Sequence, residues 1–581
     1  MNDLTKQIAE EIHEFDKKSL DINPSFAPTQ RDILNLIDSY WMNKFRDGDR
    51  DDSGFKKAFF NVIGNPTQVA SKMLDLDSKD VRVVAEEGQS YYPAWLFGKE
   101  LRLWMKEKKN CMAEGLPKTF GQFLNNIVYN FPKYGSIVLK KAQEKIYLTP
   151  LHNLHFDTSA ETLLETPVVE EHSMTAGQMR AMKEWDEEKV EEAITKFGES
   201  GGKIKLYERS ELVGSKINYS IIAGNLSKKD GITIEDTTLN EFLYKELHYD
   251  KVPGRWLGRG NPEKLFEAQI AKNQNEVYFR QGLRWTSKHL WQTRDELIAS
   301  NLLTDVENGD IIISPSEVNP ISMEERNLHS YRASDSKWDE NIAKETFSYD
   351  VIRGERPPAG TPLGSAKIAA VMTSGFFDMK REDLGMFLKE VLWDWVIPDF
   401  KKHKGSVHKL MLGEFSEDEV EKLRRLISTD RFNKSLIDYI AKNGRIPDKA
   451  ERDILRTAIR ERLKTKKDLT IPVAYYDNAK INIDFIITAE QIDMAARLST
   501  LSFILQILGS NPTIFRDARA RKVFYQALDL SGINPTQFEI EEEEEELAGM
   551  AGRRVAERAG GGVSRMPPVM GAASATIPQT L

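Results

Sequence analysis

The stretch IRGERPPAGTPLGS, residues 352–365, separates two long segments that have the periodicity of helices. It holds three prolines and three glycines, so its backbone fits neither a helix nor a central strand. The preceding residues predict a helix over 322–352, and the following residues predict another over 365–395 that ends at Pro398. The sequence therefore predicts a protruding loop with few accessible shapes between two helices.

A second boundary lies upstream, at Gly258-Arg-Gly-Asn-Pro-Glu-Lys-Leu265. Asn261 followed by Pro262 is the N-cap and first-turn chemistry of a helix. The pattern beyond it predicts one long helix that runs to about Asp295.

A short β insertion is predicted between this helix and the helix at 322–352. Asn308-Gly309 separates the apolar runs 302–306 and 311–313, which is the strongest hairpin signal in the chain. Pro315 and Pro320 close the insertion.

The N-terminal region combines helical and strand patterns. Residues 30–45 and 93–108 are amphipathic, as expected of surface helices. Residues 135–157 place β-branched and aromatic runs on both sides of a polar segment and predict a hairpin, and short strands are predicted at 204–207 and 218–223. The region is therefore expected to be α+β.

The C-terminal region is mainly helical in pattern. Ser416 and Glu419 form a capping-box signature that predicts a helix ending at Ile427. Residues 448–464 form a charged amphipathic helix, and residues 481–487 alternate as a half-buried strand. Residues 539–581 begin with a run of glutamates and continue with low complexity, so this tail is expected to be disordered.

Composition limits the class of protein. The chain has 581 residues, 81 Lys plus Arg against 90 Asp plus Glu, a net charge of −9, and 40% hydrophobic residues, which is typical of a soluble globular protein. A single cysteine, Cys111, and a charged first segment predict synthesis in a reducing cytosol. No apolar run is long enough for a membrane span, and the acidic excess argues against tight binding of nucleic acid.

His152, His155 and Asp157 lie within six positions and are the residue types of a metal site. The alternative is a strand and its exit turn with partly exposed polar side chains. Since no other cluster supplies the missing ligands, no bound metal is expected.

Three further catalytic patterns are weak. The segment Gly198-Glu-Ser-Gly-Gly-Lys203 resembles a phosphate loop, but no Ser or Thr follows Lys203 and the order is helix, loop, strand, so it is interpreted as a turn. Cys111 has no nearby histidine, and no GxSxG motif occurs. The sequence therefore gives no support for an enzyme.

A basic stripe lies on the helix that follows Gly260. Its members recur at multiples of four and lie near one face, and they are Lys272, Arg280, Arg284 and Lys288. The alternative to a functional stripe is a solvated or inter-subunit face. Aromatic residues on the same helix indicate that it needs neighbours.

This order of elements resembles that of the portal proteins of tailed double-stranded DNA bacteriophages, over about residues 90–538. The hairpin at 135–157 resembles the portal wing, and Gly258-Arg-Gly-Asn-Pro-Glu-Lys-Leu265 resembles the entry to the first stem helix. Ile352-Arg-Gly-Glu-Arg-Pro-Pro-Ala-Gly-Thr361, followed by the helix with Phe376-Phe377, resembles the tunnel loop and its helix. The apparent clip is short, and the first ~90 residues match no part of the family.

The resemblance implies an α+β, portal-like fold: an α/β wing, a stem of long helices with a short β clip insertion, a tunnel loop and a mainly helical crown. On this sequence it implies a wing at 1–257, a first stem helix at 258–295, a clip at 296–321, a second stem helix at 322–352, a tunnel loop at 353–365, a long wing helix at 366–399, a wing return and crown at 400–538, and an acidic tail at 539–581.

The resemblance also implies a ring, dodecameric in known portals, at one capsid vertex of the virion, made in the host bacterial cytoplasm. Its implied partners are copies of itself, double-stranded DNA in the channel, the terminase large subunit, the major capsid protein, and head–tail connector or tail proteins, without cofactor or membrane. The DNA-facing residues implied in the tunnel loop and stem are Arg353, Arg356, Lys367, Lys272, Arg280, Arg284 and Lys288. The partner-binding residues implied in the clip are Asn308, Gly309, Ile311 and Ile313.

Two other classes share some of these features. Another virion structural or adaptor protein would also lack catalysis, but adaptors are usually much shorter. A metal-dependent hydrolase would need His152, His155 and Asp157 to bind a metal.

Overall fold

The computed structural model describes most of the chain up to residue 485. The described residues are 3–18, 28–41, 61–76, 81–85, 91–113, 115–142, 144–198, 202–286, 290–292, 294, 316–317, 319–321, 328–348, 363–403, 408–411, 417–464, 468–471, 481–485 and 506. The chain divides into two units, Met1–Thr488 and Ala489–Leu581, and the second contains one described residue. None of the described helices is long and apolar enough to cross a membrane.

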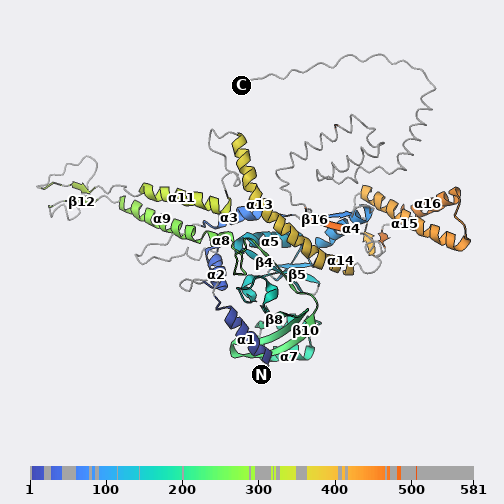
Figure 1. Ribbon diagram of the computed structural model, residues 1–581, viewed down its shortest axis with the longest axis horizontal. Helices are drawn as coiled ribbons and strands as arrows, with labels where there is room; N and C mark the ends of the chain where they lie inside the picture. The colour runs from blue at the N-terminus through green and yellow to red at the C-terminus, as the bar shows by residue number, and fades with distance from the viewer. Residues whose placement is uncertain are drawn as a thin grey trace, which may run out of the picture. The chain divides into compact units, whose positions relative to one another are not determined.

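The described part of the chain is mixed α+β, as the sequence predicts, with two five-stranded sheets (Figure 1). The first sheet has the order β11-β4-β5-β2-β3, with β2 (Cys111–Ala113), β3 (Leu116–Lys118), β4 (Ser136–Ala142), β5 (Lys145–Thr149) and β11 (Tyr244–His248). The second has the order β10-β9-β8-β7-β6, with β6 (Leu154–His155), β7 (Val168–Met174), β8 (Ile204–Val213), β9 (Lys216–Asn225) and β10 (Asp230–Leu239). All neighbouring strands are antiparallel except β2 and β5.

The predicted hairpin at 135–157 is confirmed by β4 and β5, in which Leu139 pairs with Leu148. The strands predicted at 204–207 and 218–223 are also confirmed, within the longer β8 and β9. Helical periodicity in the segment between β7 and β8 yields α6 (Ala176–Arg180) and α7 (Glu187–Phe197), two helices joined by a turn.

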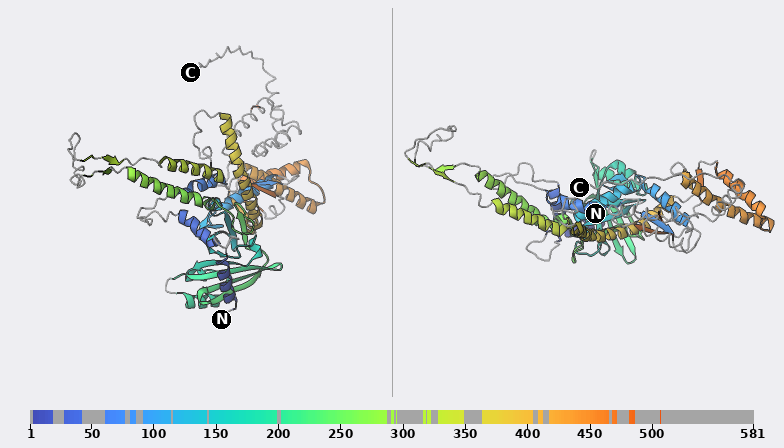
Figure 2. Two further views of the ribbon diagram at one scale, coloured as in Figure 1. Left: turned by 60° about the vertical axis from the view of Figure 1, so that its left-hand side comes forward. Right: turned by 90° about the horizontal axis from the view of Figure 1, so that it is seen from above.

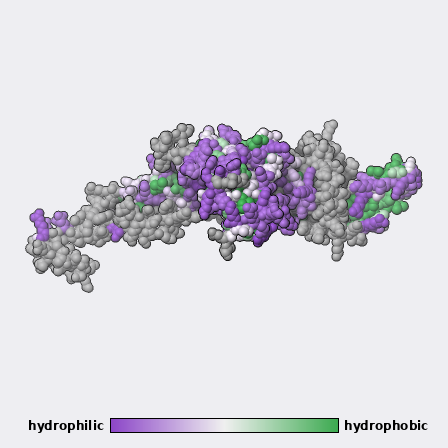
Figure 3. Space-filling model, turned by 90° about the horizontal axis from the view of Figure 1, so that it is seen from below, coloured by the Kyte–Doolittle hydropathy of each residue, from purple (hydrophilic) through white to green (hydrophobic). Residues whose placement is uncertain are grey.

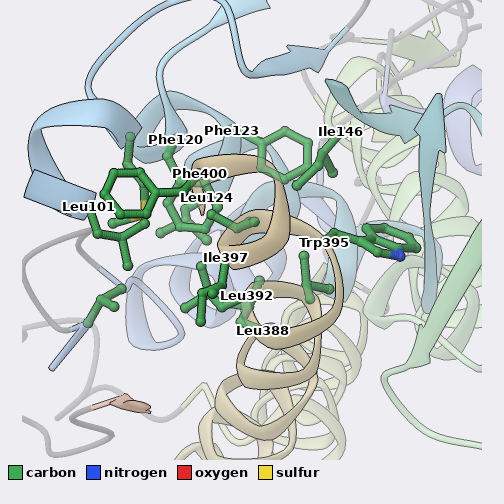
Figure 4. Packing of buried hydrophobic residues seen from close by; sticks show 14 of the residues in the cluster. Leu101, Phe120, Phe123, Leu124, Ile146, Leu388, Leu392, Trp395, Ile397 and Phe400 are labelled. Atoms are coloured by element: carbon green, nitrogen blue, oxygen red, sulfur yellow. The ribbon is translucent and has the colours of Figure 1, made fainter. Parts of the chain in front are cut away.

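The largest core cluster joins the first sheet to three helices. α4 (Tyr91–Met105) and α5 (Phe120–Tyr134) contribute Leu101 and Leu124, and α13 (Leu363–Val391) contributes Leu388. Figure 4 shows Leu388 and Leu392 one helical turn apart, beside the aromatic and aliphatic residues of α4 and α5. The i, i+4 spacing of such residues buries one face of the long helix.

The helix that follows the Pro/Gly-rich loop does not end at Pro398, contrary to the prediction. It continues through a π-helical turn, η6 (Leu392–Val396), into α14 (Ile397–His403). The backbone N–H of Ile397 bonds to the carbonyl of Leu392, the longer spacing of a π turn. Pro398 follows at the second position of α14, where a missing N–H is tolerated because helix starts leave donors unpaired.

The predicted single helix from Gly260 to Asp295 is also corrected. A short helix, α8 (Asn261–Lys264), precedes α9 (Phe266–Thr286), and residues 290–292 form strand β12 (Leu290–Gln292). β12 pairs with β13 (Asn319–Ile321), a contact between residues far apart in sequence that local periodicity does not reveal. The second long helix, α11, spans Leu328–Thr346 within the predicted range 322–352.

Among the first 90 residues, which match no part of the family that the sequence resembles, the described ones form three helices and a strand. α1 (Asp3–Phe15) packs on the second sheet through Ile8, and α2 (Gln30–Trp41) places Ile37 in the core near Trp256. The remaining N-terminal elements are α3 (Gly64–Met73) and β1 (Val81–Ala85).

The C-terminal elements follow the predicted order. β14 (His408–Met411) pairs with β15 (Asp468–Ile471), and between them lie α15 (Glu417–Asn443) and α16 (Lys449–Lys464), which confirms the helix predicted at 448–464. α15 begins beside the predicted cap but runs well beyond the predicted end at Ile427. The predicted strand at 481–487 is confirmed as β16 (Ile481–Phe485), paired with β1. The predicted tail at 539–581 lies outside the described residues.

Candidate functional site

The helices α9 and α11 lie side by side and antiparallel, as Figures 1 and 2 show. Asn275 donates to the hydroxyl of Ser334 at 3.1 Å. Gly282 lies so close to Leu328 that a Cβ at position 282 would be 2.8 Å from a methyl carbon of that leucine. The side chain of Leu328 on α11 therefore packs over the bare backbone of Gly282 on α9.

Lys272, one of the predicted stripe residues, lies between the two helices. Its ammonium group is 2.5 Å from Asp339 and 3.3 Å from Asp335, both on α11, and its side chain is only 13% exposed. Two carboxylates from the neighbouring helix therefore neutralise Lys272, and its charge serves the pairing of α9 with α11.

The rest of the predicted stripe faces solvent where it is described. Arg280 is exposed and donates to Glu276 at 2.6 Å, one turn earlier, and Arg284 is exposed one turn later. Lys288 lies outside the described residues. α9 carries three Lys or Arg against two Asp or Glu, and α11 carries three against four, so the pair has no net charge.

The base of the helix pair is fixed by ion pairs. Arg255 makes two hydrogen bonds of 2.8 Å to Glu263 of α8, and both side chains are largely buried. Asp250 pairs with Lys264 of α8 and, at 2.8 Å, with Lys380 of α13. A bidentate Arg–carboxylate pair orients as well as attracts, so the start of the pair is held at a set angle to α13.

Glycine is required where the chain enters α8. A Cβ at Gly260 would lie 2.7 Å from the carbonyl oxygen of Lys133, and one at Gly258 would lie 2.3 Å from that of Gly135. Gly135 itself ends α5 with a left-handed φ of 77°. The helix cap is Gly260 and not Asn261 as predicted, because the asparagine is buried and the tight packing leaves room only for glycine.

Several predicted site residues lie outside the described part of the chain. These are Arg353 and Arg356 of the predicted tunnel loop, and Asn308, Gly309, Ile311 and Ile313 of the predicted clip. Lys367 lies in α13, but the structure describes only its backbone. Of the segment predicted as the clip, 296–321, the structure describes Ser316, Glu317 and β13. β13 pairs with β12, which lies in the segment predicted as the first stem helix, and Trp291 is opposite Pro320.

The three residues that the sequence analysis weighed as metal ligands, and for which it expected no bound metal, have different partners. His155 contacts Asp16 at 2.8 Å, His152 contacts Asp38 at 3.2 Å, and Asp157 binds Lys18 at 2.6 Å. Burial lowers the pKa of His152, so its ring is neutral near pH 7. These side chains attach α1, α2 and the segments that follow them to the sheets, and their ligand atoms do not converge on one point.

A buried charge cluster, which the sequence analysis missed, joins the two sheets. Lys140 of β4 lies 2.8 Å from Glu170 of β7 and 2.5 Å from Glu208 of β8. Glu170 and Glu208 are directly opposite in the β7–β8 register, where like charges repel. His172 lies 3.1 Å from Glu208 and 3.4 Å from Glu170. Lys140 and His172 together offset the two carboxylates.

The protonation of this cluster follows from its geometry. Burial lowers the pKa of His172, but the two glutamates more than offset this effect and raise it to about 9. Lys140 and His172 likewise hold the pKa of both glutamates low against the effect of burial. Two cations and two anions are therefore buried together at neutral pH.

Among the described residues, Glu170, His172 and Glu208 are the one group of three or more potential ligands that meet closely enough to hold a metal. The ammonium group of Lys140 lies among them at hydrogen-bonding distance. Tyr244 of β11 and Tyr219 of β9 donate to Glu170 and Glu208 at 2.9 and 2.8 Å. The charged groups of the cluster thus have hydrogen-bond partners, and the cluster links the two sheets.

Two other residues weighed for chemistry have ordinary surroundings. Cys111 is buried in β2, and burial raises the pKa of its thiol to about 12, which disfavours a nucleophilic thiolate. Lys203 is exposed just before β8 and follows α7, which is the helix, loop, strand order predicted for a turn.

Comparisons with known proteins give weak matches only. No family model and no curated protein matches the chain. Among solved structures, the chain is similar to one in "Neck of empty GTA particle computed with C6 symmetry", with 8% identity, a TM-score of 0.34, and 72% of this chain and 97% of that chain covered. It is also similar to a chain in "Virion of native gene transfer agent (GTA) particle", with 9% identity, a TM-score of 0.35, and 78% and 99% covered. Scores in this range do not establish a function.

Proposed function

We propose that this protein is a phage portal protein: a ring at one capsid vertex that serves as the conduit for DNA packaging and ejection. The observation that carries the proposal is the antiparallel pair of α9 and α11, which leads into the β12–β13 ribbon at one end and is fixed to an α+β body at the other. This order of elements supports the proposal, because the family that the sequence resembles has a stem of long helices that leads into a β clip.

The dimensions of the pair suit a channel wall. At 1.5 Å per residue, the 21 residues of α9 extend about 32 Å and the 19 residues of α11 about 29 Å. In a closed ring of identical chains, each pair has a neighbour on both flanks. This accounts for exposed apolar side chains such as Ile270 and Leu283 on a helix whose partner α11 covers only one side.

The charge of the pair suits transit of DNA. A channel that carried many unpaired cations would bind the phosphates and slow the polyanion. Here Lys272 is neutralised by α11, and the helices together have no net charge. Arg280 and Arg284 remain at the surface, and we propose that they make weak, salt-screened contacts with the passing duplex.

The proposal extends to the segments outside the described residues. Arg353 and Arg356 of the loop at 353–365, together with Lys367, are proposed to face DNA, as is Lys288 beyond α9. Asn308, Gly309, Ile311 and Ile313 are proposed to form the clip that docks the terminase large subunit and later the head–tail connector or tail proteins. The body is proposed to contact the major capsid protein. We propose no catalytic role for the chain.

Negative-stain electron microscopy of the purified full-length protein, with mass photometry of the same sample, tests the proposal. We expect rings with a central hole, and a mass that is an integral multiple of the chain mass near twelve. A compact monomer at all protein concentrations and salt conditions would contradict the proposal.

A further inference from the structure

We infer that neighbouring copies of this chain dock through two complementary helix surfaces, an acidic and apolar stripe on α13 and η6 and a basic stripe on α16. This inference rests on the proposed ring, and it names the contact that closes it. Both surfaces are exposed in the single chain.

The first surface, called here the α13 stripe, consists of Met379, Glu382, Met386, Glu390 and Trp393. The spacings of three and four residues place these side chains along one face of the helix. Met379, Met386 and Trp393 recur every seven residues and are 51%, 52% and 36% exposed. A seven-residue apolar repeat on an exposed helix is the pattern of a helix–helix contact.

The charge of the α13 stripe is mainly acidic. Within residues 375–394, the exposed charged side chains are Glu382, Glu390 and Asp394, while Lys389 is half-buried and Lys380 and Arg381 are buried. Lys245 lies 2.5 Å from Asp394 and 3.8 Å from Glu390, but these carboxylates stay 58% and 69% exposed. A partner surface must therefore supply cations as well as apolar contacts.

The second surface, called here the α16 stripe, consists of Lys449, Arg452, Arg456 and Arg460. All four side chains are exposed, and their spacings of three, four and four residues align them on one face. The guanidinium group of Arg456 also lies over the ring of Phe432 on α15, 4.8 Å from its centre. Ile446, in the turn that precedes α16, is 69% exposed. Figure 3 shows apolar side chains at the surface of the α15–α16 hairpin, among polar ones, at the right-hand end.

The two stripes are similar in length and complementary in charge. The α13 stripe extends over about 21 Å of helix from Met379 to Trp393, and the α16 stripe extends over about 17 Å. The stripes occupy different elements of the chain, so contact between copies is heterologous, and a heterologous contact closes into a ring when the rotation allows. This geometry favours a second copy of the chain as the occupant of the α13 stripe.

A basic helical stripe is also a nucleic-acid signature, so DNA is the competing occupant of the α16 stripe. The acidic, apolar stripe of similar length on the same chain favours the protein contact. The net charge of −9 also disfavours a chain that holds DNA at its periphery.

Charge reversal on each side tests the inference. One variant carries Glu382→Lys and Glu390→Lys, the other carries Lys449→Glu and Arg452→Glu, and the control carries Lys228→Glu and Lys442→Glu. The control changes net charge as much as the second variant does, at exposed residues off both stripes. Ring fraction is measured by mass photometry on full-length proteins, with circular dichroism as the check of folding.

We expect each stripe variant alone to lose at least tenfold in ring fraction, and the control to assemble as the unmodified chain does. A mixture of the two stripe variants should form rings again, because each reversed stripe then meets its opposite charge on the other chain. If a reversed chain fails to fold, Glu382→Gln with Glu390→Gln should give a smaller but measurable loss of rings.

Normal assembly of either stripe variant, or folded variants whose mixture stays monomeric, would overturn the inference. So would a Lys449→Glu and Arg452→Glu variant that forms rings but loses binding to a duplex oligonucleotide, because DNA would then be the occupant. If the unmodified chain forms no ring at all, the proposed function fails together with the inference. If only the inference is wrong, the unmodified chain still forms rings.

Discussion

Replacement of His172 by glutamine should remove most of the loss of folding stability that the buried charge cluster causes as the pH rises into the alkaline range. The ring of His172 faces Glu170 and Glu208, and Lys140, Tyr219 and Tyr244 contact the same two carboxylates. Glutamine keeps a hydrogen-bonding side chain in the same place but cannot carry a charge. The comparison of the two chains therefore isolates the effect of the one proton that His172 binds.

The magnitude follows from the raised pKa of His172. Its value is about 9 in the folded chain, against 6.5 as the ordinary value. A raised pKa means that protonated His172 stabilises the folded state. Its contribution to the free energy of unfolding is complete below about pH 6.5 and is lost as the pH rises through 9. At 1.36 kcal/mol per pKa unit, the full contribution is roughly 3 kcal/mol as an upper bound.

Urea unfolding of both full-length chains, followed by tryptophan fluorescence at pH 6, 8 and 10, measures this contribution. We expect the unmodified chain to exceed His172→Gln in midpoint at pH 6 and to lose that advantage by pH 10. The lysine and the tyrosines are present in both chains, so their titration largely cancels in the difference. A midpoint difference that does not change with pH would refute the reasoning.

Four further predictions follow from the same contacts. Lys140→Met should destabilise the chain by about 3–5 kcal/mol in the same unfolding assay, because it leaves two buried carboxylates short of a cation; a loss below 1 kcal/mol would show that solvent reaches the cluster. Gly260→Ala should lower the urea midpoint and reduce ring fraction, because a Cβ at position 260 would lie 2.7 Å from the backbone carbonyl oxygen of Lys133, while Gly375→Ala, whose Cβ meets no atom within 4 Å, should change neither; equal behaviour of the two would count against close packing where the chain enters α8. Arg353→Ala with Arg356→Ala should leave rings intact but lower DNA packaging or retention in a salt-dependent way, and unchanged retention across salt concentrations would remove this loop from the DNA path. Truncation after Phe538 should leave ring formation intact, and failure of the shortened chain to assemble would mean that the tail has a structural role.

The sequence predicts helices and strands well where neighbouring residues determine them. The helix at Asn261-Pro262 begins within one residue of its predicted position, and the hairpin of β4 and β5 has the predicted strands. The β16 strand was predicted from alternation, but its partner β1 lies about four hundred residues earlier and no local signal points to it. For the same reason α9 was predicted too long, since Leu290–Gln292 becomes a strand only by pairing with Asn319–Ile321.

In the candidate site too, features set by neighbouring residues could be predicted, and contacts between residues far apart in the sequence could not. The four basic residues of the predicted stripe share a helical register, but their register does not reveal that Lys272 meets Asp335 and Asp339 on another helix. Lys140, Glu170 and Glu208 come from three strands, and only the stacking of the two sheets brings them together. A weak signal was present in the alternation of Glu170 and His172 on the face of β7 that otherwise carries Val168 and Met174.

Single-particle cryo-electron microscopy of the assembled full-length protein tests the central claim most directly. The account predicts a closed ring of identical chains in which the α9–α11 pairs form the wall of a central channel and the β12–β13 ribbons lie together at one end. A particle without a channel, or a ring with these helices on its outer rim, would contradict it.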